Sequence, residues 1–172
     1  MPVNGAERAD LSAIDYYRRL YGDAWIDLCE RSIERMKHGN TQRGGSIVGI
    51  SSPGVNAALY KPDRTYSGPG CGKAMLEYSM RIYARVGAEH NINVNVIIPG
   101  IVHTEAWEKA ALYRQSEEDV SEMLQRLVDR MIPMKRLLEP TDIGEVIAFL
   151  CSPPGKLITG VALPVDGGQH IN

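Results

Sequence analysis

The chain has 172 residues, a formal net charge of −2 and 44% hydrophobic residues. This balance is that of an ordinary globular protein, and the lack of basic tracts excludes a nucleic-acid-binding class. No apolar run approaches the length of a membrane-spanning helix, and the start MPVNGAERAD is too polar for a signal peptide. Three cysteines without Cys-x-x-Cys spacing predict reduced thiols. We therefore expect a cytoplasmic protein without nucleic-acid or membrane partners, one domain over residues 1–172, with residues 1–12 loosely held.

The first periodic segment, residues 14–36, predicts an amphipathic helix, because apolar residues recur at spacings of three and four. Its expected inner face consists of Ile14, Tyr17, Tyr21, Ala24, Trp25, Leu28, Ser32 and Met36. The helix should end before His38-Gly39-Asn40.

Residues 44–100 read as a strand, a loop, a helix and a second strand. The short apolar run at 45–50 predicts a buried strand, residues 73–88 have helical spacing, and NINVNVIIPG is rich in β-branched residues. Two strands joined in this way should be parallel with a right-handed crossover. Ligands bind beyond the carboxyl ends of such strands. This places Ser51, Ser52, Pro99 and Gly100 on one rim.

The last third of the chain predicts further helices and one more strand. A lid helix is expected at 107–113, a helix capped by Ser116, another capped by Thr141, and a strand at 161–165. The expected fold is therefore α/β, with about three parallel strands, helices on both faces of the sheet, and the strand at 45–50 as an uncovered edge.

Several motifs appear in a fixed order: ISS at 50–52, a helix starting with Lys73-Ala74, VNVIIPGIVHT at 94–104 and ITGVALPVDGG at 158–168. This set resembles the carboxyl-terminal half of the short-chain dehydrogenase/reductase family over about residues 16–168. The resemblance implies a truncated, Rossmann-like three-layer domain without the family's Gly-rich nucleotide turn. The family's catalytic Asn falls on Tyr21 or Gly22, and Pro69 stands where its Tyr-x-x-x-Lys motif has tyrosine. The chain is thus expected to be a truncated and degenerate member.

Four residues are the catalytic candidates: Ser52, Tyr66, Lys73 and His103. The resemblance makes Ser52 the serine that bonds the substrate carbonyl, and Lys73 matches the family lysine. Tyr66 lies seven residues before Lys73 instead of four. If Gly68-Pro69-Gly70 is an insertion, Tyr66 could take the place of the missing tyrosine; otherwise it is a loop residue. A nearby ammonium lowers a phenol pKa, which suits proton transfer.

The candidates for substrate binding are Ser51, Tyr60, Pro99, Gly100, Thr104, Glu105 and Trp107. In the family the residue matching Thr104 touches the nicotinamide amide, and the segment containing Trp107 covers the substrate. The four histidines show no metal-ligand spacing, so we expect no metal. The run SGPGCGKA fits a phosphate-binding loop poorly, because a serine replaces the first glycine and an alanine the hydroxyl residue.

Three functions are consistent with these residues. The favoured one is cofactor-independent acid/base chemistry on a small carbonyl substrate, such as cyclisation, dehydration or isomerisation of a polyketide-like or other secondary metabolite. The second is an NAD(P)-dependent, 3-oxoacyl-reductase-like oxidoreductase completed by another chain, and the third is a non-catalytic subunit of a full-length relative. In each case we expect a homodimer or homotetramer through the helices at 14–36 and 73–88, which carry more than one apolar stripe.

Overall fold

The structure is a computed structural model that describes residues 9–38, 44–56, 58–61, 66–106, 109 and 119–171. Within this part, a three-stranded parallel sheet has the order β1-β2-β3. The strands are β1 (Gly45–Ile50), β2 (Ile92–Pro99) and β3 (Ala162–Val165). The predicted α/β fold with three parallel strands is confirmed, and β1 is an edge strand as expected.

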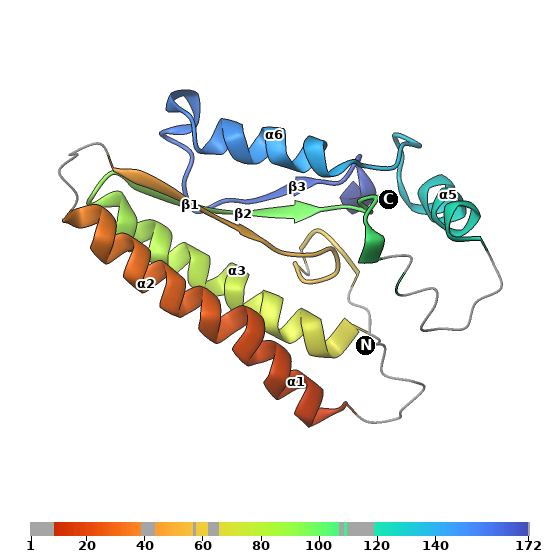
Figure 1. Cartoon of the computed structure of the whole chain (residues 1–172), viewed down its shortest axis with the longest axis horizontal. Coiled ribbons are helices and arrows are strands. Elements are labelled where there is room, and N and C mark those ends of the chain that lie inside the picture. The colour runs from red at the N-terminus through yellow and green to blue at the C-terminus, as the bar shows by residue number, and fades with distance from the viewer. Residues whose placement is uncertain are drawn as a thin grey trace.

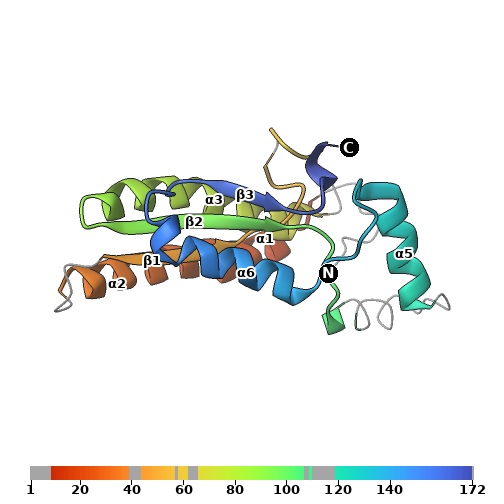
Figure 2. The same cartoon turned by 90° about the horizontal axis from the view of Figure 1, so that it is seen from above.

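Helices cover both faces of this sheet (Figures 1 and 2). One face carries α1 (Leu11–Tyr17), α2 (Ala24–Lys37) and α3 (Ser67–Ala88), and the other carries α6 (Pro140–Leu150). Helix α5 (Val120–Met131) lies beyond the carboxyl ends of the strands. The result is the three-layer arrangement predicted from the sequence.

Two hydrophobic clusters, one on each face, hold the layers together. The first includes Trp25, Met80 and Val94, and the second includes Ile97 and Val128. Strand β2 supplies residues to both clusters and is buried from Ile92 to Ile98. A central strand buried on both faces reads as a nearly continuous apolar run, which explains its sequence.

The predicted helix at 14–36 is present, but it contains a π-helical segment, η1 (Arg18–Asp23), between α1 and α2. A π turn adds one residue to the helical repeat, so the inward face shifts after it. Cys29 and Ile33 are buried, whereas Leu28, expected to face inward, is 59% exposed. Trp25 and Met36, which were also expected to face inward, lie in or against the first hydrophobic cluster, so the predicted inner face was wrong at Leu28 and missed Cys29 and Ile33.

Helix α3 starts at Ser67, six residues before the expected start at Lys73. Lys73 thus lies well inside the helix instead of in its first turn. Leu76, Met80 and Tyr83 face the core, while Ile82 and Val86 on the second apolar stripe are exposed. Met80 is fully buried within the chain, so it belongs to the hydrophobic core and not to a subunit interface.

The helix caps differ from those predicted. Asp119 caps α5 by accepting hydrogen bonds from the amides of Ser121 and Glu122 at 2.8 and 3.3 Å. Helix α6 begins with a capping box between Glu139 and Asp142 instead of a Thr141 cap.

Ser116, the predicted cap, and the predicted lid helix at 107–113, apart from residue 109, lie outside the described residues. Among the helices that the structure describes, none is long and apolar enough to cross a membrane.

Candidate active site

The two serines that follow β1 point to different partners. The Ser51 amide donates to the Ile97 carbonyl at 2.8 Å and so extends the β1–β2 ladder by one residue. The Ser51 side chain is buried, and its hydroxyl donates to the Glu77 carboxylate of α3. Since successive residues of an extended chain alternate in direction, Ser52 points away from this contact. Ser51 therefore ties the end of β1 to β2 and α3, and Ser52 is the better candidate for contact with a substrate.

Tyr66 lies against Ser52. Its hydroxyl donates to the Ser52 Oγ at 2.9 Å, and both residues are partly buried. Tyr66 occupies the N-cap of α3, which runs without interruption through Gly68-Pro69-Gly70. Those residues are thus helical, and the tyrosine at the N-cap reaches the serine. Seven residues make about two helical turns, so Tyr66 and Lys73 share one side of α3, about 10 Å apart along its axis.

Lys73 enters the same rim. Its ammonium donates to the carbonyl of Ile50, the last residue of β1, and lies 4.1 Å from the centroid of the Tyr21 ring. Burial lowers the pKa of Lys73 from its ordinary value, because the charged form loses hydration. The structure therefore brings Ser52 and Tyr66 into contact and places the Lys73 ammonium at the end of β1, on the same rim of the sheet.

The glycines at the start of α3 serve helix packing. A Cβ on Gly68 would meet the Tyr17 ring at 3.0 Å, and a Cβ on Gly72 would meet the Tyr17 carbonyl oxygen at 2.3 Å. Both glycines are buried, so α1 and α3 approach closely here. A phosphate-binding loop needs open backbone amides, and this helix start is covered. The structure therefore explains the Gly-rich run without a nucleotide phosphate.

The loop after β1 is fastened at two points. The Asn56 amide donates to Glu77 at 3.4 Å, and the buried Tyr60 hydroxyl donates to Asp166 at 2.6 Å. Burial raises the pKa of Glu77, against the opposing effect of hydrogen bonds from Ser51 and Asn56. Tyr60, predicted to bind substrate, is thus engaged with the end of the chain.

Asp166 is a site residue that the sequence reasoning missed. It is 3% exposed and accepts hydrogen bonds from Tyr60, from His170 Nδ1 at 2.9 Å and from the amides of Gly168 and His170 at 3.0 and 2.9 Å. Burial alone would raise its pKa, but the hydrogen bonds from Tyr60 and His170 outweigh it and hold the pKa below the usual value. The only sequence signal was an acid between a strand and two glycines.

The remaining predicted residues follow β2. Gly100 donates from its amide to the Val165 carbonyl at 3.0 Å, and a Cβ there would meet Asp166 Cα at 2.8 Å, so only glycine fits beside Pro99. His103, Thr104 and Glu105 are exposed.

An open pocket of about 560 Å³ is lined by His103, Thr104, Glu105, Ala106 and Pro140. His103 Nδ1 lies 3.5 Å from Glu139 Oε1, and both side chains are more than half exposed. The structure thus gives His103 a partner at the start of α6. Trp107 lies outside the described residues.

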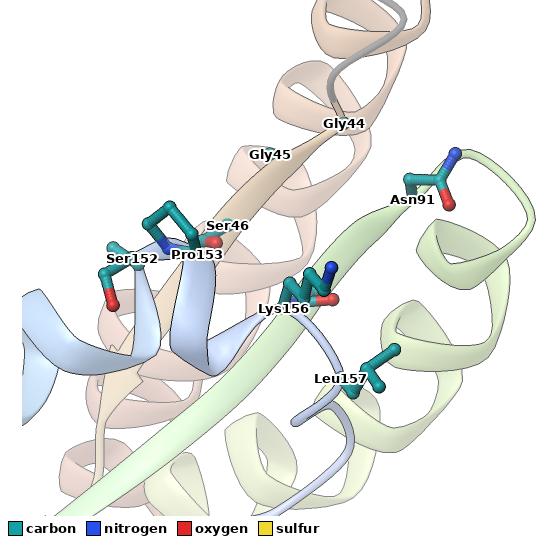
Figure 3. Close-up of a pocket in the computed structure, with 10 residues that line it drawn as sticks. Gly44, Gly45, Ser46, Asn91, Ser152, Pro153, Lys156 and Leu157 are labelled. Atoms are coloured by element: carbon teal, nitrogen blue, oxygen red, sulfur yellow. The ribbon is translucent and has the colours of Figure 1, made fainter.

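A second pocket, of about 780 Å³, lies at the opposite end of the sheet (Figure 3). Its lining comes from the start of β1, the start of β2 and the turn after α6, and consists of Gly44, Gly45, Ser46, Asn91, Asn93, Cys151, Ser152, Pro153, Lys156 and Leu157. Because ligands of open parallel sheets bind at the carboxyl ends of strands, the Ser52 rim is the better candidate site.

The three-stranded parallel sheet, covered by helices on both faces, defines a Rossmann-like α/β fold. A family model described as enoyl-(acyl carrier protein) reductase matches residues 23–170. The chain therefore belongs to the short-chain dehydrogenase/reductase family.

Similar proteins are oxidoreductases by name. Oxidoreductase UcpA of Salmonella typhimurium is 40% identical over 130 residues, covering 76% of this chain and 48% of the relative. L-rhamnose 1-dehydrogenase (NAD(P)(+)) of Azotobacter vinelandii is 32% identical over 133 residues, covering 76% of this chain and 46% of the relative. The chain thus spans about half the length of the curated relatives it matches.

Among solved structures, L-sorbose reductase from Gluconobacter frateurii, complexed with NADPH and L-sorbose, matches all of this chain and 63% of its own. The TM-score is 0.82 and the identity 28%.

These similarities overturn two expectations. The favoured function, cofactor-independent cyclisation, dehydration or isomerisation, was wrong, and so was the expectation of no cofactor, because the matching proteins are oxidoreductases and the structural neighbour carries NADPH. Losing the family spacing of tyrosine and lysine was too weak a reason to abandon redox chemistry.

Proposed function

We propose that this chain forms the substrate side of an NAD(P)-linked oxidoreductase that interconverts a carbonyl and an alcohol on a small molecule. The names of its relatives support this, and so does the cluster of Ser52, Tyr66 and Lys73. The nucleotide phosphates would be held by a segment outside these 172 residues. Its natural docking place is the free edge of β1, which pairs with β2 on one side.

The donor set suits the nicotinamide end of the cofactor. The hydroxyls of Ser52, Tyr66 and Thr104 and the Lys73 ammonium all follow the carboxyl ends of β1 and β2 or enter their rim. Thr104 and Lys73 are the residues that would hold the nicotinamide and its ribose. The phosphates find no such match at the start of α3, where Gly68 is packed against Tyr17. When bound, the nicotinamide supplies or accepts a hydride.

The chain's own residues manage the carbonyl oxygen and a proton. The Ser52 hydroxyl, already an acceptor from Tyr66 at 2.9 Å, would donate to the substrate oxygen and stabilise its developing negative charge. Tyr66 would give the proton to that oxygen during reduction and take it back during oxidation. The Lys73 ammonium places a positive charge on the same side of α3. We infer that the seven-residue spacing is a variant arrangement of the family pair and still serves proton transfer.

The hydrogen bond between Tyr66 and Ser52 is the observation that carries this proposal. The test is NAD(P)H oxidation by the chain, alone and together with a separately produced family nucleotide-binding half, against a panel of ketoses, small ketones and 3-oxoacyl thioesters. We expect substrate-dependent oxidation that Tyr66→Phe abolishes. Activity that survives in Tyr66→Phe with Ser52→Ala would contradict the proposal, and so would the absence of activity with every substrate when the nucleotide half is present.

We also propose that two copies associate through the outer faces of α2 and α3. Leu28, Ile82 and Val86 expose apolar surface there, with Leu28 59% and Ile82 51% exposed. Neighbouring exposed stripes on two helices suit a symmetric contact with a second copy. Ile82→Asp should give a smaller species by light scattering and keep the wild-type melting temperature. An unchanged assembly would exclude this surface.

A further inference from the structure

Lys73 meets an aromatic ring at the rim. Its ammonium lies 4.1 Å from the centroid of Tyr21 and donates to the backbone carbonyl of Ile50. Burial lowers the pKa of Lys73, so the ammonium is held in a place that disfavours its charge. A cation over an aromatic face within about 6 Å is attracted by the ring quadrupole, most strongly where water is excluded.

The position of Tyr21 depends on the π-helical segment. Tyr21 lies in η1 (Arg18–Asp23), where the wider turn changes the direction of side chains along the helix. Its ring stacks on Tyr17, with centroids 5.7 Å apart and planes at 13°. Tyr16 meets Tyr17 edge-on at 5.2 Å. The close approach of Gly72 to the Tyr17 carbonyl fixes α1 against α3, so the ring is held between Tyr17 and Lys73.

The ring offered to the ammonium is a neutral phenol. Burial raises the pKa of Tyr21, and neighbouring Tyr66, Tyr17 and Tyr16 raise it further. A phenolate would attract the lysine by simple charge pairing, whereas a neutral ring attracts it through its face.

Nearby carboxylates on the surrounding elements are engaged elsewhere. Glu77, one turn after Lys73 on α3, accepts from Ser51 and Asn56. On α1 and η1, Asp15 and Asp23 pair with Arg18 at 2.9 and 2.6 Å. Among the residues that the structure describes, the Tyr21 ring and the Ile50 carbonyl are the groups in contact with the Lys73 ammonium, and both favour its charged form.

We propose that Tyr21 is a positioning residue, whose ring face holds the Lys73 ammonium in place and in its charged form beside the Ser52–Tyr66 pair. Its consequence for the reaction rests on the proposed function, but the contact itself does not. Tyr21 acts through Lys73 and needs no contact with substrate. The π segment thereby acquires a role, because it carries the ring that the Lys73 ammonium contacts.

The test is an NMR titration of the Lys73 ammonium in the full chain, assigned with Lys73→Gln. Tyr21→Phe keeps the ring and should leave the Lys73 pKa within a few tenths of a pH unit. Replacing residue 21 by phenylalanine with one, two and then three fluorines weakens the ring quadrupole and keeps the shape, so folding is preserved. We expect a stepwise fall of the Lys73 pKa that reaches about one pH unit. The same series at exposed Tyr78 should have no effect.

A Lys73 pKa that is unchanged across the fluorinated series would overturn the proposal, and so would an equal shift from the Tyr78 series. This experiment contains neither nucleotide nor substrate. A stepwise fall without NAD(P)H oxidation would therefore defeat the proposed function alone. Where NAD(P)H oxidation is found, its rate should fall along the same series. The limb of its pH–rate profile that reports Lys73 should shift together with the Lys73 pKa.

Discussion

The two ends of the sheet use polar residues in different ways. At the carboxyl end, side chains from distant segments pair with one another, as Tyr66 does with Ser52 and Tyr60 with Asp166. Towards the amino end, buried Asn95 clamps backbone by donating to the Ile158 carbonyl at 2.7 Å and accepting from the Val161 amide at 3.2 Å. Backbone clamps fix a strand and leave no reactive group, whereas paired hydroxyls and acids can move protons. The contrast favours the carboxyl end as the site proposed for chemistry, although the larger of the two pockets described above lies at the other end.

The sharpest test of this contrast is Tyr66→Phe. Removing the hydroxyl that donates to Ser52 should lower turnover by about 10²–10⁴-fold, because proton transfer to the substrate oxygen loses its donor. The fold should remain, since the ring stays in place. Tyr78→Phe, at a 73% exposed position, is the matched control. Adding Ser52→Ala to Tyr66→Phe should lower turnover little further, because residues acting as one unit are not additive.

A second substitution tests whether the carboxyl end of the sheet also stabilises the fold. Asp166→Ala should cost about 3 kcal/mol of unfolding free energy, because it leaves the buried Tyr60 hydroxyl and the His170 ring without their partner. Urea unfolding measures the loss. Asp27→Ala is the control, since Asp27 pairs with Arg31 on an exposed helix face and should cost less than about 0.5 kcal/mol. Equal losses in the two variants would show that the Asp166 cluster is not a clamp.

At the other end, Asn95→Ala should cost about 2 kcal/mol, because two partly buried backbone groups lose their partner. Asn93→Ala removes a single hydrogen bond, at 3.2 Å to the Gly155 carbonyl, and should cost about 1 kcal/mol. Turnover per folded molecule should be unchanged in both variants. A large loss of turnover in Asn95→Ala would break the distinction between the two ends.

The sheet could be predicted from the sequence because its strands carry strong local signals. Residues 45–50 matched β1 at both ends, since an apolar run between glycines and serines fits few other structures. The π segment could not be predicted, because no local pattern in Arg18–Asp23 distinguishes it from an ordinary α-helix. For the same reason Cys29 and Ile33 were left out of the predicted inner face, although both are buried.

The site was partly readable for a similar reason. Ser52 and Lys73 follow from strand ends and from the family motif, but the Tyr66 contact depends on where α3 starts. Helix propensity argued against a start upstream of Gly68-Pro69-Gly70, and tertiary packing against Tyr17 overrode it. Asp166 and His170 are far from Tyr60 in the sequence, and no local pattern joins them.

The smallest expected effect is a change in folding stability at acidic pH. The pKa of Asp166 lies below its ordinary value of 3.8, because hydrogen bonds from Tyr60 and His170 outweigh burial. The folded state therefore binds fewer protons here than the unfolded chain, and stability rises with pH in this window. The contribution of Asp166 to stability is complete above about pH 4 and is lost as the pH falls through the pKa of Asp166 in the folded state.

In Asp166→Asn the amide can still accept a hydrogen bond from Tyr60 but does not titrate. The stability gap between wild type and this variant, measured by urea unfolding from pH 7 to pH 3, should shrink below about pH 4. The carboxylates of Asp15 and Asp142, whose pKa values are also lowered by their arginine partners, titrate in both proteins and cancel in the difference. A gap that stays constant down to pH 3 would show that Asp166 contributes through shape and not through its charge.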